Sequence, residues 1–167
     1  MRKFVVAIAA VAALAACASR PEPVAETTPT NTTPPTTSQP SGPVAGSAED
    51  FRVSVGDRIF YGYDRFDLSP EARSVLERQA AWLQRYPNVR VLVAGNADER
   101  GTREYNLALG ARRAAAARDY LTSLGVAANR METVSYGKER PLDPRSNEEA
   151  WSVNRNAHTQ IVSGAVS

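Results

Sequence analysis

The chain has 167 residues, with 20 Lys and Arg against 18 Asp and Glu, one His and one Cys. A single Cys excludes a disulfide framework within the chain and any multi-cysteine metal site, and a single His excludes a zinc site built on a His pair. The length suffices for one ordinary domain with its own core. The formal net charge of +2 divides unevenly along the chain, into +2 for residues 1–16, −3 for residues 17–50 and +3 for residues 51–167.

Residues 1–16 are typical of a secretory signal peptide. Arg2 and Lys3 precede thirteen residues without a polar side chain, fewer than the roughly 20 that a membrane-spanning helix needs. The run Leu14-Ala-Ala-Cys17 resembles the bacterial lipobox, in which the Cys is lipidated and the chain is cleaved before it. We therefore expect a mature chain that begins at a triacylated Cys17. Ala18 favours transfer to the outer membrane. The alternative is an ordinary signal peptide followed by an incidental Cys.

Residues 17–50 are predicted to form the lipidated N-terminus and a disordered tether. Seven of the eleven prolines and seven threonines fall within residues 18–48, where hardly any apolar side chain is larger than Val. Such a composition buries too little surface to offset chain entropy and favours partly polyproline-like structure. Fully extended, these residues would span up to about 100 Å. A glycosylated stalk is the alternative interpretation of a segment rich in Thr and Pro.

Residues 51–167 alternate between strand and helix patterns. Aromatic and β-branched residues predict a strand over residues 57–63. Ser69-Pro-Glu71 supplies an N-cap, a proline at the first helical position and an acid in the first turn, which predicts a helix that Pro87 closes. Residues 89–94 are apolar enough for a strand in the middle of a sheet.

The second half of this segment continues the alternation. A loop over residues 95–103 leads into a long helix, which Gly125 is expected to end. Strands are predicted over residues 131–136 and 157–162, with a short helix between them that begins at a capping box over residues 146–149. The order β-α-β-α-β-(α)-β predicts an α+β sandwich, a mixed sheet with helices on one face, preceded by the tether. The long helix has a narrow face of small and apolar residues, namely Leu107, Gly110, Ala114, Ala117, Leu121 and Leu124.

The loop over residues 95–103 and the helix after it carry the most distinctive chemistry. Asp98 lies in the loop, and Asn106, Leu109 and Arg113 fall on one stripe of the helix, beside its apolar face. A carboxylate and an arginine together can hold a zwitterion, because the guanidinium fork binds a carboxylate with two hydrogen bonds. Alternatively, these are solvated charges on a helix face, since Arg supplies 16 of the 17 basic residues after residue 50.

Three motifs carry a resemblance to a known family. Residues 95–102 read G-N-A-D-E-R-G-T against the family's G-H-A-D-E-R-G-T, and residues 106–114 follow its helix pattern N-x-x-L-S-x-x-R-A. Residues 134–141 match V-S-Y-G-K-E-x-P. Residues 58–162 therefore resemble an OmpA-like peptidoglycan-binding domain, and the whole chain resembles the peptidoglycan-associated lipoprotein family.

The resemblance implies that the domain binds the meso-diaminopimelate stem peptide of peptidoglycan, whose side-chain end is a zwitterion. By motif position, Asp98 would hold the ammonium and Arg113 the carboxylate. Asp64 would lie at the edge of a pocket that is lined by Arg100, Thr102 and Leu109.

The resemblance also implies a location and partners. The lipid on Cys17 would hold the protein in the outer membrane with its domain facing the periplasm, and the domain would link that membrane to the cell wall. The family contacts TolB, and through it the Tol system that draws the outer membrane inward at cell division. No nucleic-acid partner, no metal and no cofactor besides the covalent lipid are expected.

Three positions depart from the family pattern. Asn96 replaces the usual His of the loop, and Asn156 replaces the second Arg of an N-R-R motif before the last strand. The second departure weakens any role for an arginine at that position in holding a carboxylate. Gly110 stands where Ser is common in the wider group. The lone His158, on the expected last strand, is interpreted as structural.

The residues favour binding over catalysis. Asp98 and Glu99 are adjacent acids, whereas glycoside hydrolysis needs two carboxyl groups at a set separation across a cleft. The sequence has no G-x-S-x-G motif, no phosphate-binding loop and no cluster of metal ligands. We therefore expect a module that is not an enzyme. The remaining alternative is a structural lipoprotein that binds protein partners and whose peptidoglycan pocket is vestigial.

Overall fold

The computed structural model describes residues 42–166. The predicted signal peptide, the predicted lipidation site Cys17 and the predicted tether up to residue 41 lie outside the described residues. No helix within residues 42–166 combines the length and the apolar character needed to cross a membrane.

Four strands form one mixed sheet, which confirms the predicted fold class. The strands are β1 (Arg58–Phe60), β2 (Arg90–Asn96), β3 (Met131–Gly137) and β4 (Asn156–Ser163), and they are arranged in the order β1-β4-β2-β3. The β1–β4 and β4–β2 pairs are antiparallel, whereas the β2–β3 pair is parallel. The last strand of the chain therefore lies inside the sheet, next to the apolar β2.

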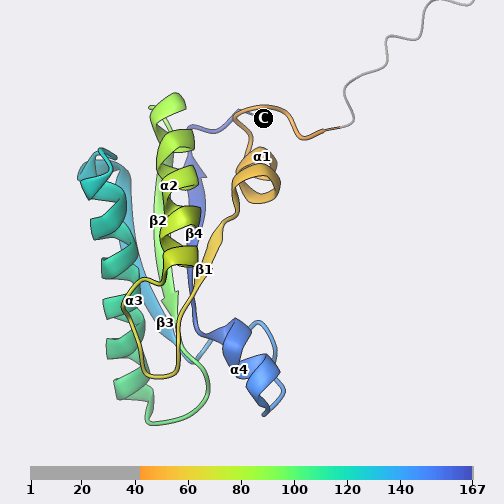
Figure 1. Ribbon diagram of the computed structural model, residues 1–167, viewed down its shortest axis with the longest axis vertical. Coiled ribbons are helices and arrows are strands. Elements are labelled where there is room, and N and C mark those ends of the chain that lie inside the picture. The colour runs from red at the N-terminus through yellow and green to blue at the C-terminus, as the bar shows by residue number, and fades with distance from the viewer. Residues whose placement is uncertain (1–41, 167) are drawn as a thin grey trace, which may run out of the picture. The chain divides into compact units, whose positions relative to one another are not determined.

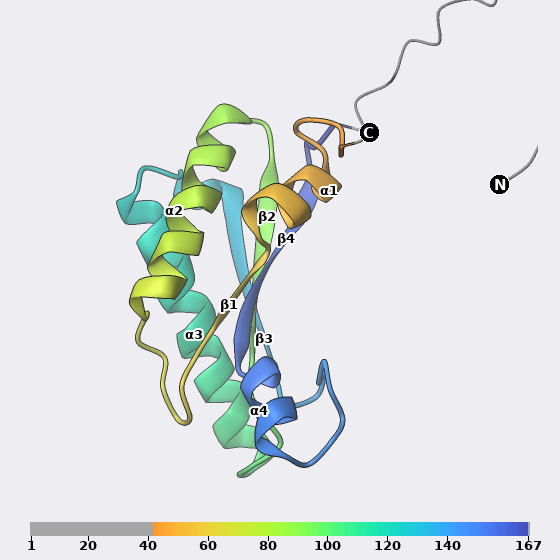
Figure 2. The same cartoon turned by 45° about the vertical axis from the view of Figure 1, so that its right-hand side comes forward.

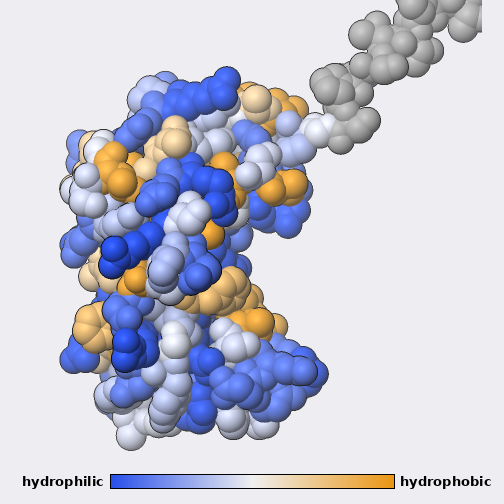
Figure 3. Space-filling view, viewed as in Figure 1, coloured by the Kyte–Doolittle hydropathy of each residue, from blue (hydrophilic) through white to orange (hydrophobic). Residues whose placement is uncertain are grey.

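The two long helices cover one face of this sheet (Figures 1 and 2). They are α2 (Pro70–Arg85) and α3 (Arg103–Ser123). The short α4 (Glu148–Asn154) lies beyond one end of the sheet, and the short α1 (Ala48–Asp50) lies near the other end (Figure 1). The surface in the same view is mainly hydrophilic, with hydrophobic residues in small separate areas (Figure 3).

Three of the five predicted helix boundaries are correct, and two are wrong by one residue. One of these two is the start of α3, which begins at Arg103, the last residue of the predicted loop. The Ser69 side chain accepts from the backbone N–H of Ala72, with Pro70 in the first turn, and α2 ends before Pro87. Gly125 follows Leu124, the C-cap of α3, and takes a φ of 94°, which glycine adopts without strain. The predicted capping box is wrong by one residue, because Asn147 rather than Ser146 caps α4 and accepts from Ala150 N–H. Asn is as good a cap as Ser, so both positions offered a start.

The folded domain begins earlier than the predicted boundary at residue 51. Ser47 caps α1, which continues into a π-helical turn over Phe51–Val55. The Asp50 carboxylate accepts from Trp82 Nε1 at 2.9 Å, and Phe51 packs edge-on against the Trp82 ring. Near the C-terminus, the Val166 N–H donates to the Gly46 carbonyl. The Pro- and Thr-rich composition thus ends before Gly46, and the last residues of the predicted tether belong to the domain.

The core lies between the helices and the sheet and includes one satisfied polar cluster. Leu76, Leu83, Val91, Val93 and Leu121 are buried there with other apolar residues. Gln79 is also fully buried, as the apolar periodicity of its helix implies. Its amide donates to the Gly56 carbonyl at 2.7 Å and accepts from the Thr159 hydroxyl at 2.9 Å, so its polar atoms remain bonded away from water.

Candidate functional site

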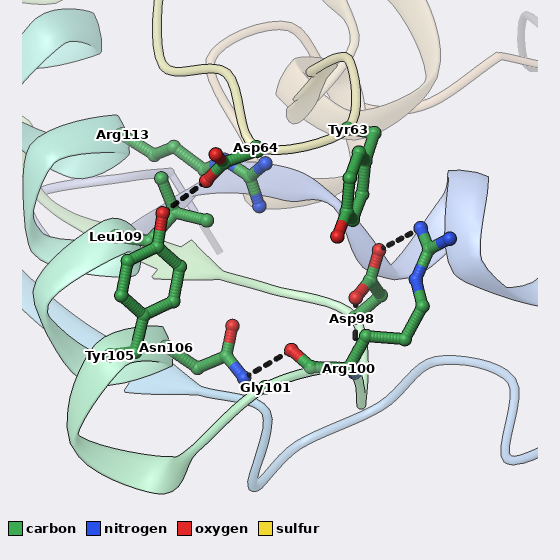
Figure 4. Close-up of a pocket in the computed structure, with 9 residues that line it drawn as sticks. All are labelled: Tyr63, Asp64, Asp98, Arg100, Gly101, Tyr105, Asn106, Leu109 and Arg113. Carbon is green, nitrogen blue, oxygen red and sulfur yellow. Dashed lines mark hydrogen bonds and ion pairs between the residues drawn. The ribbon is translucent and has the colours of Figure 1, made fainter.

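A polar cavity of about 160 Å³ lies where two loops meet the first turns of α3 (Figure 4). One loop follows β1, and the other connects β2 to α3. The lining residues are Tyr63, Asp64, Asp98, Arg100, Gly101, Tyr105, Asn106, Leu109 and Arg113. The cavity therefore brings together two carboxylates and two guanidinium groups from three separate parts of the chain.

Five of the six pocket residues expected from the sequence line this cavity, and Thr102 does not. The Thr102 side chain is the N-cap of α3, where its oxygen accepts from the Tyr105 backbone N–H at 3.2 Å. Thr102 is therefore part of the motif because it starts the helix, and not because it lines the pocket. Asp64, expected at the edge of the pocket, lines the cavity as part of its rim.

Four lining residues and one residue behind the cavity were not expected from the sequence. Tyr63, Gly101 and Tyr105 line the cavity as neighbours of predicted residues, and the sequence places Asn106 only on the helix stripe. Behind the cavity, the buried Arg155 donates to the Asp98 carboxylate. Its position just before the last strand, in the family's N-R-R motif, is the one signal that could have indicated it.

The hydrogen bonds that hold Arg113 in place all go to backbone oxygens, and its guanidinium also lies over the Tyr61 ring, 5.1 Å from the ring centre. Arg113 is fully buried, and it donates from Nε to Arg65 O at 2.8 Å, from Nη1 to Asn96 O at 2.8 Å and from Nη2 to Gly62 O at 3.1 Å. Burial lowers the pKa of Arg113 to about 10, so the guanidinium still carries its charge at neutral pH. A guanidinium has five N–H donors, and three are used here. The two that remain can bind an anion in the cavity.

Asp98 is a buried carboxylate with two arginine partners. Its Oδ2 accepts from Arg100 Nη2 at 2.6 Å and from Arg155 Nη1 at 3.3 Å, and its Oδ1 accepts from the Arg100 backbone N–H at 3.1 Å. Burial raises the pKa of Asp98, but the hydrogen bonds from Arg100 and Arg155 outweigh it and leave the pKa below its ordinary value. Asp98 is therefore ionised at neutral pH.

Arg100 lies between two aromatic rings. Its guanidinium carbon is 4.2 Å from the centre of the Tyr63 ring and 4.1 Å from the centre of the Trp151 ring. Because a planar cation is attracted to the face of an aromatic ring, both rings help to hold Arg100 in its place against Asp98. Trp151 is itself fixed, since its Nε1 donates to Glu99 at 3.0 Å.

Asp64 and Tyr105 form the opposite rim of the cavity (Figure 4). The Tyr105 hydroxyl donates to Asp64 Oδ1, and this bond raises the pKa of Tyr105. Asp64 has a φ of 55°, the one positive φ of a non-Gly residue within residues 42–166. Asp tolerates this left-handed conformation better than most residues, which is consistent with a tight turn that places the carboxylate over the cavity.

His158 lies away from this cavity. Its Nε2 is 3.0 Å from Asp57 Oδ2, and its Nδ1 is 3.0 Å from Gln160 Nε2. Burial lowers the pKa of His158 despite the nearby Asp57. Within residues 42–166, no group of three or more His, Cys, Asp or Glu side chains is placed to hold a metal ion.

The geometry suits a small ligand that carries both charges. Arg113 presents free N–H donors, whereas Asp64 and Asp98 present carboxylate oxygens to the same cavity. Leu109 adds an apolar side chain for the carbon atoms between the two charged ends. The arrangement therefore matches the shape of a zwitterion, with charged groups for both of its ends and an apolar contact between them.

Comparison with known proteins identifies the family. The OmpA family model matches residues 60–155. A peptidoglycan-associated lipoprotein of Mesorhizobium japonicum is 49% identical over 160 residues, covering 96% of this chain and 91% of that one. Another, from Agrobacterium fabrum, is 58% identical over 120 residues, covering 72% of this chain and 67% of that one. The crystal structure of the peptidoglycan-associated lipoprotein from Burkholderia pseudomallei is 39% identical, with a TM-score of 0.61 over 63% of this chain and 89% of that one. The chain therefore belongs to the OmpA family and, within it, to the peptidoglycan-associated lipoproteins.

Proposed function

We propose that the cavity binds the side-chain end of meso-diaminopimelate in the peptidoglycan stem peptide, without catalysis. The observation that carries this proposal is the pairing of a buried guanidinium, fixed by three carbonyls, with carboxylates in one cavity of about 160 Å³. Arg113 takes the ligand carboxylate, and Asp98 takes the ligand ammonium. The names of the relatives, which refer to peptidoglycan, support the choice of this zwitterion over a free amino acid.

Asp98 can accept an ammonium although two arginines already contact it. A carboxylate offers about four lone-pair positions, and three of those on Asp98 are occupied. The remaining position is on Oδ1, because Oδ2 accepts from both arginines. The ammonium would therefore approach the oxygen that now accepts only from the Arg100 backbone N–H.

The proposed role of the whole protein is a non-covalent link between the outer membrane and the cell wall. The lipid on Cys17 holds one end in the membrane, and the domain binds the wall from the periplasm. We further propose that the protein acts with TolB and other proteins of the Tol system when the outer membrane is drawn inward at division. In the alternative, the protein binds such partners while its peptidoglycan pocket is vestigial.

Binding by one domain should be weak, because Asp98 and Arg113 are buried and the cost of desolvating the charged groups offsets much of their attraction to the ligand. Many anchored copies that face one polymer would bind firmly together, since anchoring raises the effective concentration without new contacts. We therefore expect the anchored protein to remain at the wall while the soluble domain exchanges readily. Photobleaching recovery of the two forms in cells tests this, and equal recovery times would contradict it.

Calorimetric titration of the domain with stem tripeptides tests the pocket assignment. A tripeptide that ends in meso-diaminopimelate should bind, whereas the matched tripeptide with Lys at that position should not, because it lacks the carboxylate for Arg113. Asp98→Asn should weaken binding of the first peptide. Equal binding of the two peptides would contradict the assignment.

A second experiment addresses the whole protein and its alternative role. The domain should be retained on purified sacculi, and Arg113→Ala should abolish retention. Retention that survives this substitution would contradict the pocket, and no retention of the wild type would favour the partner-binding role. Release of muropeptides from the sacculi would instead reveal an enzyme. For the anchor, globomycin should cause an uncleaved, lipidated precursor to accumulate, and its absence would contradict lipidation of Cys17.

A further inference from the structure

Two buried asparagines meet where the β2–β4 ladder ends. The last backbone pair of this ladder is Gly95 with Ala157, so the next antiparallel pair would be Asn96 with Asn156. At this position the side chains bond instead, because Asn96 Nδ2 donates to Asn156 Oδ1 over 2.9 Å. The two residues are only 6% and 1% exposed. A side-chain amide bond thus continues the contact between the strands one residue beyond the ladder.

The backbone on either side of this pair leads to Asp98 of the pocket and to its partner Arg155. Asp98 follows Asn96 by two residues, and Arg155 directly precedes Asn156. These two charged residues then meet again as an ion pair of 3.3 Å. The Asn96 carbonyl oxygen is in addition the acceptor for Arg113 Nη1 at 2.8 Å. The amide pair is therefore close to the backbone that carries Asp98, and the Asn96 carbonyl is one of the contacts that hold Arg113.

Asn156 also fixes the turn between α4 and β4. Its Nδ2 donates to the carbonyl oxygens of Val153 at 2.8 Å and Asn154 at 3.2 Å. Its Oδ1 lies 3.4 Å from Arg58 Nη1 as well as accepting from Asn96. An amide side chain is suited to this position because it both donates and accepts. Alanine at either position would remove the 2.9 Å bond and leave the freed atom of the remaining amide with only a long contact of 3.4 Å, from Asn96 to the Ala94 carbonyl or from Arg58 to Asn156.

We propose that the Asn96–Asn156 pair is a positioning element of the pocket, which sets the places of Asp98, Arg155 and Arg113. The two departures from the family motifs are then the two halves of one contact rather than separate losses. An arginine at position 156 is not needed to hold a ligand carboxylate, because Asn156 acts through Arg155 and Asn96. For its effect on the ligand, this inference rests on the proposed function.

The first test needs no ligand. The carboxyl pKa of Asp98 is measured by NMR titration in the wild type, in Asn156→Ala and in Thr159→Val. The charged groups around Asp98 are its partners Arg100 and Arg155, with Arg113, Glu99 and Glu148 nearby. Asn156→Ala should raise the pKa of Asp98, because Arg155 loses its fixed place. An unchanged pKa would overturn the inference.

Thr159→Val is the matched control for this titration. It removes another buried bond between side chains from the same strand, the 2.9 Å bond to Gln79, at a distance from the pocket. It should leave the pKa of Asp98 unchanged. A rise as large as that in Asn156→Ala would reveal a general effect of destabilisation and overturn the inference. Asn96→Ala removes the same contact from β2 and serves in the titration where Asn156→Ala does not fold.

The second test is a double-mutant cycle with the diaminopimelate tripeptide. Asn96→Ala and Asn156→Ala should each weaken binding by about 3- to 10-fold, the factor expected for one lost hydrogen bond. The double variant should bind the tripeptide only slightly less tightly than the single variant with the larger loss, because both substitutions remove the same contact. Fully additive losses, or an equal loss in Thr159→Val, would overturn the inference. Failure of the wild type to bind the peptide would contradict the proposed function, while the Asp98 titration would still decide whether the pair positions the pocket.

Discussion

Arg155 donates from Nη1 to Asp98 Oδ2 over 3.3 Å, and the two side chains are only 8% and 6% exposed. Arg155 also donates from Nε to the Tyr61 carbonyl and from Nη2 to Glu148 at 2.7 Å. Arg155 lies directly before β4. Its side chain therefore connects the start of β4 with α4, with the loop after β1 and with the acidic loop after β2. The ion pair supports the pocket from behind, because Arg155 is not among the residues that line the cavity.

Replacement of Arg155 by Ala should destabilise the domain. Asp98 would lose one of its two arginine partners, and removal of one member of a buried ion pair reduces stability by on the order of 3 kcal/mol. Urea unfolding of the two proteins measures this difference. Arg52→Ala, which breaks an exposed pair with Glu49, is the control and should cause no measurable change. A loss in Arg155→Ala no larger than in the control would contradict the prediction.

Replacement of Arg113 by Lys should weaken binding of the diaminopimelate tripeptide by about tenfold or more. Lysine keeps the charge but cannot donate to three carbonyls and also present a fork to the ligand. Calorimetric titration measures the affinity. Arg112→Lys is the matched control, because Arg112 is an exposed neighbour on the same helix that does not line the cavity. Equal affinities of the two variants would contradict the role of Arg113.

Asp98 should contribute to the acid stability of the domain. Its pKa in the folded state is below the ordinary value of 3.8, so the unfolded chain takes up this proton first as the pH falls. The contribution is therefore complete above pH 3.8 and is lost as the pH falls through the lower pKa of the folded state. Urea midpoints between pH 2.5 and 6 should decline less steeply below pH 4 in Asp98→Asn than in the wild type. Parallel curves would contradict this.

Local signals predicted the architecture well, because each of them is complete within a few residues. Ser69 and Pro70 start α2 as predicted, and Gly125 ends α3. The order of strands and helices then leaves few ways to cover one face of a sheet. The predicted start of the domain is too late because Asp50 is fixed by Trp82, a contact across about 30 residues that composition does not reveal.

The site residues could be predicted where a residue of the family motif also lines the cavity. Asp98 and Arg113 are such residues, whereas Thr102 belongs to the same motif because it caps α3. Tyr63 and Trp151 escaped prediction because their role depends on Arg100, which lies between them in space but far from both in sequence. Contacts of this kind follow from the folded structure and have no local sequence signal.

The close approach of α3 to the sheet depends on Gly95 and Gly110. A Cβ atom added to Gly110 would lie 2.8 Å from the Gly95 carbonyl oxygen and closer still to the Ser135 hydroxyl, and one added to Gly95 would collide with the Gly110 carbonyl. We expect Gly95→Ala to destabilise the domain by about 3 kcal/mol or more, because the obstacle is backbone and α3 must move outward. That movement also shifts Arg113, one turn further along α3 than Gly110, so the protein that still folds should bind the tripeptide more weakly.

Gly42→Ala is the control, since a Cβ atom there meets nothing within 4 Å. Urea unfolding and calorimetric titration of the wild type and the two variants measure both effects. Stability and affinity of Gly95→Ala equal to those of the control would show that α3 packs with room to spare.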